Sequence, residues 1–337
     1  MPSKRLVAPA MRDVARLAGV APMTVSRALS GHPSVRPETR QIVVRAANEL
    51  GYVHNFMASA LLRRGSKLIA LVVPNVSNSV FAETIHGLEE VLSAEGYTLT
   101  IGHSGYSQHE EERLVRTLLG YGPDGVVLTG FVHTKMTRAL LKRAGVPIVE
   151  TWNTGIKPID MAVGFSNYDA AFQATEYLIG RGRRKLAYAG GTQTDNDRTM
   201  AREAGFRAAV AKAGLAVSED LICTLPMELS SGVELARRFA QARRKPNALF
   251  AASDVIAAGF ILESNRLGIR VPDDIAVVGF DDAPLSETIS PALSTIHIPQ
   301  REIGRVTASL ILQRLAGEKN VPKLHDVGFR IVSRASA

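Results

Sequence analysis

Polar and aromatic side chains stand just beyond several strand-like apolar runs of this 337-residue chain. Asn75, Trp152, Ser253 and Asp281 each lie two or three residues after such a run. Ligands of parallel α/β domains bind beyond the carboxyl ends of the strands, so these positions are candidates for a binding site. Side chains that hydrogen-bond, set beside an aromatic ring, suit a sugar. Each residue taken alone could equally be a helix cap or a loop filler.

Arg202 is the charged candidate in the same half of the chain. We expect it to open a helix after the polar loop 192–198. A guanidinium group can grip a carboxylate through two parallel hydrogen bonds, so an arginine at the edge of a sugar site points to an acidic ligand.

Signatures of catalysis and of cofactor binding are missing from the sequence. No Gly-x-Gly-x-x-Gly follows a strand, and no phosphate loop ends in Gly-Lys-Ser/Thr. The segment 102–105 has the wrong spacing for a nucleophile elbow, and 109–112 lacks a second metal-binding histidine. Cys223 is the single cysteine, which excludes a disulfide within the chain and a multi-cysteine metal cluster. We therefore expect no cofactor, no metal and no enzyme, with a sugar-acid enzyme as the remote alternative.

Strands and helices alternate through most of the chain, which predicts parallel sheets wound by helical crossovers. So many strands over some 270 residues favour two α/β subdomains rather than one sheet. The expected strands are 68–73, 98–102, 125–128, 148–149, 162–164, 186–188, 221–223, 248–251 and 275–279. Helices are expected at 81–95, 110–119, 170–181 and 202–213.

The N-terminal segment differs from the rest in charge. Residues 1–67 hold 11 of the 40 Lys and Arg but only 3 of the 32 Asp and Glu, so their net charge of +8 equals that of the whole chain. A basic end on a neutral body is typical of a part that binds a polyanion. A solvated basic arm remains the alternative from charge alone.

Three short helices are expected in this basic segment, at 12–18, 22–30 and 38–50, with Ile42 among the inward residues of the third. A helix-turn-helix formed by the first two would place the second in the DNA major groove. Its outward side chains should then meet DNA: Arg27 can read guanine through its fork, while Thr24 and Ser26 suit phosphates. Pro22 and Met23 face outward beside them.

Spaced motifs along nearly the whole chain resemble the lactose/galactose repressor (LacI/GalR) family. The headpiece motifs are Asp13-Val14-Ala15, Ala18-Gly19-Val20, Thr24-Val25-Ser26-Arg27, Thr39-Arg40, Glu49-Leu50-Gly51-Tyr52 and Asn55. Those of the body are Ala252-Ser253-Asp254, Val271-Pro272-Asp273-Asp274-Ile275, Gly279-Phe280-Asp281-Asp282 and Leu293-Ser294-Thr295-Ile296.

The resemblance implies a role for each matching residue. Pro22 and Met23 match the variable pair that reads the operator. Residues 55–62 match a hinge helix that enters the minor groove, where Asn55, Ala58 and Leu61 meet DNA and Leu61 is the wedge between base pairs. In a body that resembles periplasmic sugar-binding proteins, the matching pocket positions are Phe81, Trp152, Arg198, Arg202, Ser253 and Asp281.

The chain departs from the family pattern in three places. Ala10 and Ala21 replace hydroxyl caps, which removes about 1 kcal/mol at each helix start. His54 replaces the proline before Asn55. Met23 cannot hydrogen-bond a base edge, so its readout should be apolar, for instance against a thymine methyl group.

Further motifs resemble the gluconate-operon repressor branch of the family, among them Phe81-Ala82-Glu83, Asp124-Gly125 and Ala162-Val163-Gly164-Phe165. They imply a sugar acid, most simply gluconate, as the effector. The order of basic head, hinge and α/β body predicts a homodimer on a pseudo-palindromic operator. The single cysteine suits a cytoplasmic protein, and no apolar run is long enough to span a membrane. 2-Ketogluconate, 6-phosphogluconate and a neutral sugar stay open as effectors, as do the direction of control and an architectural DNA-binder with a vestigial body.

The expected domain plan has a DNA-binding headpiece and a larger core. The headpiece is all-α and covers 1–66 with its hinge, and 67–337 forms the effector-binding and dimerisation core. The core should consist of two doubly wound parallel-sheet subdomains, like a periplasmic binding protein. Their ranges are 67–167 with 298–326, and 168–297 with 327–337.

Overall fold

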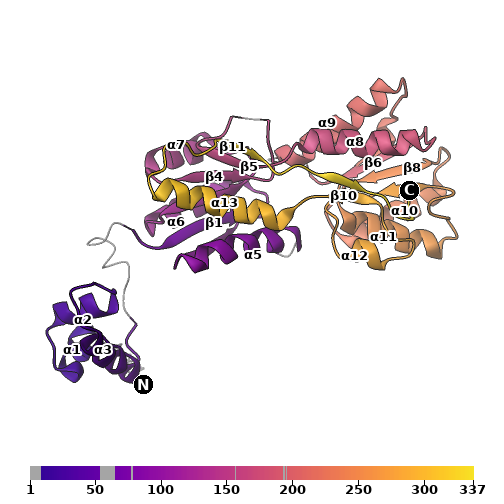
Figure 1. Ribbon diagram of the computed structural model, residues 1–337. Coiled ribbons are helices and arrows are strands. Elements are labelled where there is room, and N and C mark those ends of the chain that lie inside the picture. The colour runs from indigo at the N-terminus through magenta and orange to yellow at the C-terminus, as the bar shows by residue number, and fades with distance from the viewer. Residues whose placement is uncertain (1–8, 54–64, 77–78, 156, 193, 195) are drawn as a thin grey trace, which may run out of the picture. The chain divides into compact units, whose positions relative to one another are not determined.

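The computed structural model describes residues 9–53, 65–76, 79–155, 157–192, 194 and 196–337. The chain divides into two compact units, Met1–Ser66 and Lys67–Ala337, and Figure 1 labels the elements of each. No helix in the described part of the chain is long and apolar enough to cross a membrane.

The small unit is built from three helices, α1 (Met11–Ala18), α2 (Pro22–Leu29) and α3 (Pro37–Leu50). Its core consists of the side chains that share one stripe on each helix, Val14, Ala15, Val25, Ala28, Val43, Ala46 and Ala47, together with Val35 from the turn between α2 and α3. The expected inward position of Ile42 was wrong, because its side chain is 50% exposed. Its neighbour Val43 occupies the buried stripe, and successive helical residues point about 100° apart.

The helix starts of the small unit behave as their sequences predict. Neither Ala10 nor Ala21 provides a side-chain cap. At α1 the carboxylate of Asp13 instead accepts a hydrogen bond of 2.9 Å from the backbone N–H of Ala10, which satisfies one free donor of the first turn. Gly51 ends α3 in the left-handed conformation at φ 63°, and its backbone N–H donates to carbonyl oxygens in the last turn of that helix.

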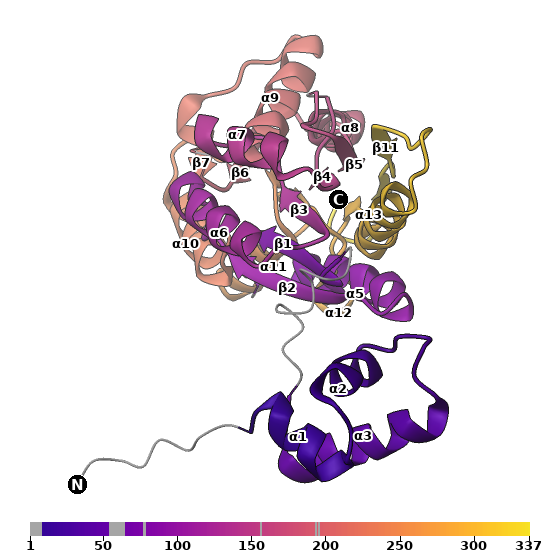
Figure 2. The same ribbon diagram turned by 90° about the vertical axis from the view of Figure 1, so that its left-hand side faces the viewer.

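The first sheet of the large unit has six parallel strands in the order β11-β5-β4-β3-β1-β2. They are β1 (Leu68–Val73), β2 (Thr98–His103), β3 (Gly125–Thr129), β4 (Ile148–Thr151), β5 (Met161–Gly164) and β11 (Leu324–Asp326). Its helices are α5 (Ser79–Ala94), α6 (Gln108–Gly120), α7 (Lys135–Ala144) and α13 (Gln300–Leu315). Helices lie on both faces of this sheet (Figure 2).

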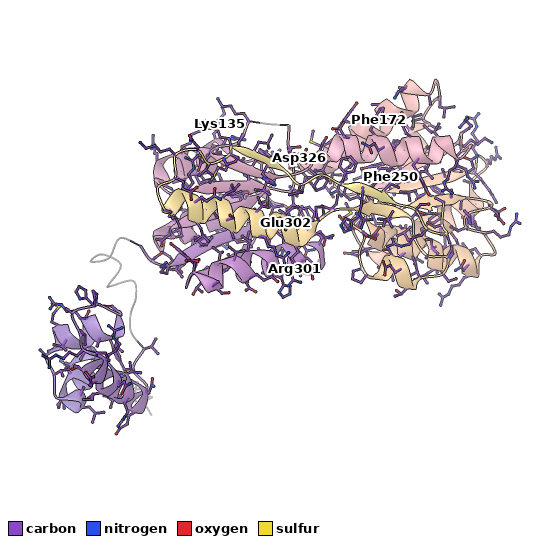
Figure 3. All side chains as sticks on the ribbon, viewed as in Figure 1. Lys135, Phe172, Phe250, Arg301, Glu302 and Asp326 are labelled. Carbon is purple, nitrogen blue, oxygen red and sulfur yellow. The ribbon has the colours of Figure 1, made fainter. Side chains whose placement is uncertain are left out.

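The second sheet has four parallel strands in the order β7-β6-β8-β9. They are β6 (Leu186–Gly190), β7 (Ile222–Thr224), β8 (Ala248–Ala251) and β9 (Ala276–Val278). Its helices are α8 (Asn167–Gly180), α9 (Asp197–Lys212), the 3₁₀ turn η1 (Glu219–Leu221), α10 (Leu229–Gln241), α11 (Asp254–Arg266) and α12 (Leu285–Thr288). Phe250, at the centre of this sheet, is fully buried (Figure 3).

The chain passes between the two lobes of the large unit three times. The passages lie between β5 and α8, between β10 (Thr295–His297) and α13, and between β11 and β12 (Arg330–Val332). β10 and β12 form an antiparallel pair beside the second sheet. Three separate passages make a hinge about which the lobes can move as rigid bodies while the carboxyl ends of their strands keep facing each other.

Two helices of the first lobe pack unusually closely. A Cβ atom on Gly304 of α13 would lie 2.1 Å from the backbone oxygen of Thr84 on α5. Beside this contact, Arg301 and Arg305 of α13 both pair with Glu90 of α5, Arg305 at 2.7 Å. Their hydrogen bonds lower the pKa of Glu90 to about 2. Figure 3 labels Arg301 at this seam.

Each predicted strand and helix of the core is present, most with shifted boundaries, but β10, β11 and β12 were not predicted. One shifted boundary affects the site. Helix α9 begins at Asp197, so Arg202 lies in its second turn and does not open it. The side chain of Asn196 caps this start by accepting a hydrogen bond from the N–H of Thr199 at 3.4 Å. The supposed polar loop therefore already contains the first helical residues.

Candidate functional site

A small cavity of about 40 Å³ lies between the two lobes of the large unit, at the carboxyl ends of their strands. Six of the seven predicted effector residues line it: Phe81, Trp152, Arg198, Arg202, Ser253 and Asp281. Asn75 lines a wider, neighbouring hollow of about 460 Å³. The two cavities share Tyr106, Asn196 and Met227.

Arg202 is buried and held rigidly at this cavity. Its Nε donates to Asn167 Oδ1 at 2.8 Å, and its Nη1 donates to the backbone oxygen of Ala252 at 2.9 Å. Burial lowers the pKa of Arg202, although the charge of Asp281 opposes this shift. Nη2 makes no hydrogen bond with the described residues. The arginine is thus oriented by two bonds and keeps one nitrogen for a ligand.

Arg198 stands one helical turn before Arg202 and is buried as well. Its Nη1 contacts Asp197 Oδ1 at 3.2 Å. The other carboxylate oxygen of Asp197 accepts from Asn153 Nδ2 at 2.7 Å and from the backbone N–H of Phe131 at 3.3 Å. The cation of Arg198 is therefore already balanced by one carboxylate, which Arg202 lacks.

Trp152 brings an unused donor to the cavity. Its side chain is 2% exposed, and its indole Nε1 has no hydrogen-bond partner among the described residues. The backbone of Trp152 is left-handed at φ 72°, a conformation that non-glycine residues adopt at a cost. Phe81 and Phe165 hold the indole edge-on, with ring centroids 5.3 and 6.2 Å away. A buried unpaired donor is costly unless a ligand or water satisfies it.

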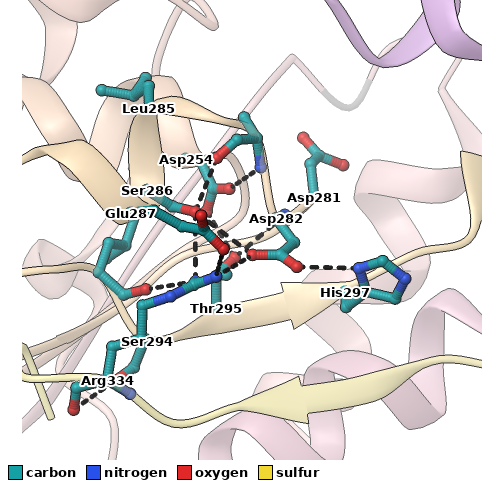
Figure 4. Close-up of polar contacts among 12 residues, drawn as sticks. Asp254, Asp281, Asp282, Leu285, Ser286, Glu287, Ser294, Thr295, His297 and Arg334 are labelled. Carbon is teal, nitrogen blue, oxygen red and sulfur yellow. Dashed lines mark hydrogen bonds and ion pairs between the residues drawn. The ribbon is translucent and has the colours of Figure 1, made fainter.

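Asp281 brings an unused acceptor. In Figure 4 its carboxylate points away from the network around Asp282, and it makes no hydrogen bond with the described residues. Burial raises the pKa of Asp281 to about 7, while the charge of Arg202 lowers it in part. This carboxyl group can therefore be present in either protonation state near neutral pH.

A polar network fixes the turn that carries Asp281. Asp282 accepts from Arg334 Nη2 at 2.8 Å and contacts His297 Nδ1 at 2.8 Å (Figure 4). Both aspartates have positive φ, 112° at Asp281 and 54° at Asp282. Such strained residues persist only where the surroundings over-determine them, and here the ion pair of Asp282 with Arg334 and its hydrogen bond with His297 do so.

A second buried polar cluster stabilises the first lobe beside the cavity. The ring of His133 lies between Glu111 Oε1 at 2.6 Å and Glu150 Oε1 at 3.1 Å. Burial by itself lowers the pKa of His133, but these hydrogen bonds outweigh it and raise the pKa to about 9. Glu150 also accepts from the backbone N–H of Ile159 at 2.5 Å, so the cluster closes the loop that begins with Trp152.

The outer face of α2 presents the predicted DNA-reading residues of the small unit. Pro22, Met23 and Arg27 are exposed, with Met23 at 59%, while Thr24 and Ser26 are half-buried. The inner face is anchored by Val25, which is fully buried. The remaining predicted DNA contacts, Asn55, Ala58 and Leu61, lie outside the described residues.

Comparisons with known proteins match both units. Residues 10–55 match the model of the bacterial regulatory proteins of the lacI family, and 175–337 match a periplasmic binding protein-like domain. The chain is 40% identical to the transcriptional regulator GntR of Pseudomonas aeruginosa, over 97% of this chain and 95% of that one. The chain belongs to the LacI family. Its identity to GntR of Escherichia coli K12 is 35%, over 96% of this chain and 97% of that one.

Solved structures of LacI-family regulators have the same fold. One from Silicibacter pomeroyi matches with a TM-score of 0.91 at 30% identity, over 97% of this chain and 99% of that one. GntR of Chromobacterium violaceum matches with a TM-score of 0.76 at 33% identity, over 80% of this chain and 98% of that one. This LacI-family protein is therefore a DNA-binding transcription regulator rather than an enzyme, with a helix-turn-helix headpiece and a two-lobed α/β core.

Several residues at the cavity of this LacI-family regulator were not predicted. Tyr106 and Met227 line it three residues after the ends of β2 and β7, so the strand-end pattern could have found them, and Asn196 and Thr199 line it from the start of α9. Asn167 contributes by orienting Arg202. A polar residue at the first position of a helix after a strand, as Asn167 is after β5, was the available signal.

Proposed function

We propose that the protein is a homodimeric repressor that binds a pseudo-palindromic operator and is controlled by a sugar acid, most simply gluconate. The observation that carries the sugar-acid proposal is Arg202, a buried cation at the cavity whose side chain makes no ion pair with the described residues. A carboxylate would form an ion pair with Arg202 and accept from its free Nη2. The motifs that resemble the gluconate-operon repressor branch, together with the identity of 40% and 35% to two GntR regulators, support gluconate as the acid.

The remaining polar groups of the cavity suit the hydroxyl groups of such a ligand. Trp152 Nε1 lacks an acceptor among the described residues, and the carboxylate of Asp281, which is turned away from the neighbouring network, can accept from a donor. A hydroxyl group provides both in one atom, since it donates one hydrogen bond and accepts two. A polyhydroxy acid therefore matches the cavity at both its charged and its neutral positions.

On this proposal, effector binding controls DNA binding by moving the two lobes about the hinge. A ligand that contacts both lobes stabilises their closed arrangement relative to the open one. In a dimer, closure changes the spacing of the two headpieces, and two half-sites one helical turn apart are read only at the right spacing. On this proposal gluconate releases the operator in the cytoplasm.

Calorimetric titration tests the effector. Wild type and Arg202→Ala are titrated with gluconate, 2-ketogluconate, 6-phosphogluconate, glucose and ribose. We expect micromolar binding of one sugar acid to wild type and its loss in the variant. Binding of glucose or ribose, or acid binding that does not depend on Arg202, would reject the proposed ligand and its anchor.

Operator binding tests the control. An operator selected from random DNA is titrated with protein by fluorescence anisotropy, with and without the bound acid. Weaker binding with the acid supports induction, and unchanged affinity contradicts the mechanism. Sedimentation equilibrium of the free protein tests the dimer.

A further inference from the structure

The two arginines at the cavity are connected to each other through one loop of the opposite lobe. Asn167 Nδ2 donates to the backbone oxygen of Trp152 at 2.8 Å and to Asn153 Oδ1 at 3.3 Å, while Asn167 Oδ1 holds Arg202. Asn153 Nδ2 in turn donates to Asp197, which pairs with Arg198. A continuous chain of hydrogen bonds among described residues therefore connects Arg202 to Arg198.

Asp197 is one of two residues at which this chain of hydrogen bonds joins the lobes, the other being Asn167 at the start of α8. Asp197 is the first residue of α9 in the second lobe, and its two partners Asn153 and Phe131 follow β4 and β3 of the first lobe. Its side chain is 7% exposed, so these contacts are hardly screened by water. One buried carboxylate thus contacts an arginine of the cavity and two separate loops across the interface.

The end of the neighbouring strand β5 leaves the backbone of Asn153 little room. A Cβ atom on Gly164 would lie 2.5 Å from both the backbone nitrogen and the backbone oxygen of Asn153. The side-chain oxygen of Asn153 accepts from the N–H of Thr154 at 2.9 Å, which directs its nitrogen toward Asp197. Asn153 is therefore pre-positioned as a donor, and a shift of α9 has to break its bond.

We propose that Asp197 is an interlobe latch, whose contacts with Asn153 and Phe131 hold the lobes closed and couple that closure to the occupancy of the cavity through Arg198. A ligand carboxylate bound to Arg202 enters the cavity that Arg198 also lines. Its charge acts on Arg198 as well, and it therefore changes the strength of the ion pair between Arg198 and Asp197. This inference rests on the proposed function only for the chemical identity of the ligand, because the latch itself is formed by residues of this chain.

The alternative role for Asp197 is an ordinary acid at a helix start, which stabilises α9 through the helix dipole. Asp169, in the first turn of α8, is the matched control because it is an exposed acid at the start of the neighbouring helix. The dipole role predicts similar effects for Asp197→Asn and Asp169→Asn. The latch predicts an effect on lobe closure for Asp197→Asn alone.

The single tryptophan of the chain provides a readout of closure that needs no ligand. Trp152 precedes Asn153 and is buried at the cavity, so opening of the lobes exposes its indole to water and shifts its fluorescence to the red. Small-angle X-ray scattering of the same full-length samples reports the separation of the lobes independently.

The sharpest variant is Asn153→Asp, which keeps the side-chain shape and the acceptor oxygen but replaces the donor with a second carboxylate facing Asp197. We expect a red-shifted emission, a larger radius of gyration and at least tenfold weaker effector binding. In the double variant Asn153→Asp/Asp197→Asn a donor faces an acceptor again, with reversed polarity, and we expect partial recovery of the emission.

The outcomes separate the latch from the effector assignment. Wild-type emission and scattering in both Asn153→Asp and Asp197→Asn would overturn the latch, whatever the ligand is. A shift that also occurs in Asp169→Asn, or that the double variant does not reduce, would overturn it in favour of a structural role. If gluconate fails to bind wild type but Asn153→Asp opens the lobes, the result supports the latch and rejects only gluconate as the effector.

Discussion

The guanidinium carbon of Arg202 lies 3.7 Å from the centre of the Phe280 ring. The stacking fixes the plane of the guanidinium group, and the bonds to Asn167 and Ala252 fix its rotation within that plane. A planar cation held in this way is pre-organised for a carboxylate, which reduces the entropy lost on binding.

Lysine at position 202 should not restore effector binding to the wild-type level. Arg202→Lys keeps the charge but loses the planar stacking and the two orienting bonds. A hydrogen bond to a charged group contributes about 1.5–3 kcal/mol, so we expect effector affinity to fall by about 10- to 100-fold. Calorimetry checks this, with Arg243→Lys at an exposed position of the same lobe as the control. Equal affinities in Arg202→Lys and wild type would show that only charge matters at this position.

The buried carboxyl group of Asp281 should make stability depend on pH. Its pKa is raised by burial to about 7, above the value near 4 of an unfolded chain. The folded protein then holds the proton more tightly, so the free energy of unfolding falls as the pH rises from about 4 to about 7. Between pH 5 and 7 this loss is at most about 3 kcal/mol.

Asp281→Asn removes the titrating group and should remove that fall. Urea unfolding of both proteins at several pH values between 5 and 8 measures it, with the exposed Asp169→Asn as the control. The slope of wild type should flatten in Asp281→Asn and persist in Asp169→Asn. Parallel slopes in all three proteins would mean that Asp281 is ionised throughout this range.

The sequence predicted β1 to β9 and the ligand end of the sheets because both depend on local patterns, but it did not predict the three-residue strands β10, β11 and β12. Apolar runs such as 68–73 are buried strands, and the polar residues after them meet at one edge. The start of α9 was misplaced because the cap at Asn196 lies within a run of polar residues. The contact between Asn153 and Asp197 joins residues 44 positions apart across two lobes, and no local pattern encodes it.

Arg27 should determine sequence preference at one operator position. It is exposed on the outer face of α2, where its fork can bind a guanine edge. We expect Arg27→Ala to weaken binding to the selected operator by about 1–3 kcal/mol and to relax the preference at a single base pair. Anisotropy titrations on single-substitution operators measure both effects. Arg45→Ala, at an exposed position of α3, should instead weaken all operators equally or not at all.

The seam between α5 and α13 should tolerate no side chain at Gly304. An alanine Cβ there would lie 2.1 Å from the backbone oxygen of Thr84 and 2.7 Å from the backbone nitrogen of Leu88. Both neighbours are backbone atoms, so the helices themselves have to move apart. Overpacking of this kind costs about 1–3 kcal/mol, and we expect Gly304→Ala to unfold at a correspondingly lower urea concentration.

Gly180 of α8 is the matched control, because an added methyl group has room there. No atom lies within 4 Å of a Cβ built there, and alanine is favoured over glycine in a helix by up to about 1 kcal/mol. Gly180→Ala should therefore leave stability unchanged or raise it. Because both substitutions add the same methyl group to a helix, a loss of stability in both would assign the effect to the backbone rather than to the seam. A loss in Gly304→Ala alone assigns it to the close approach of α5 and α13.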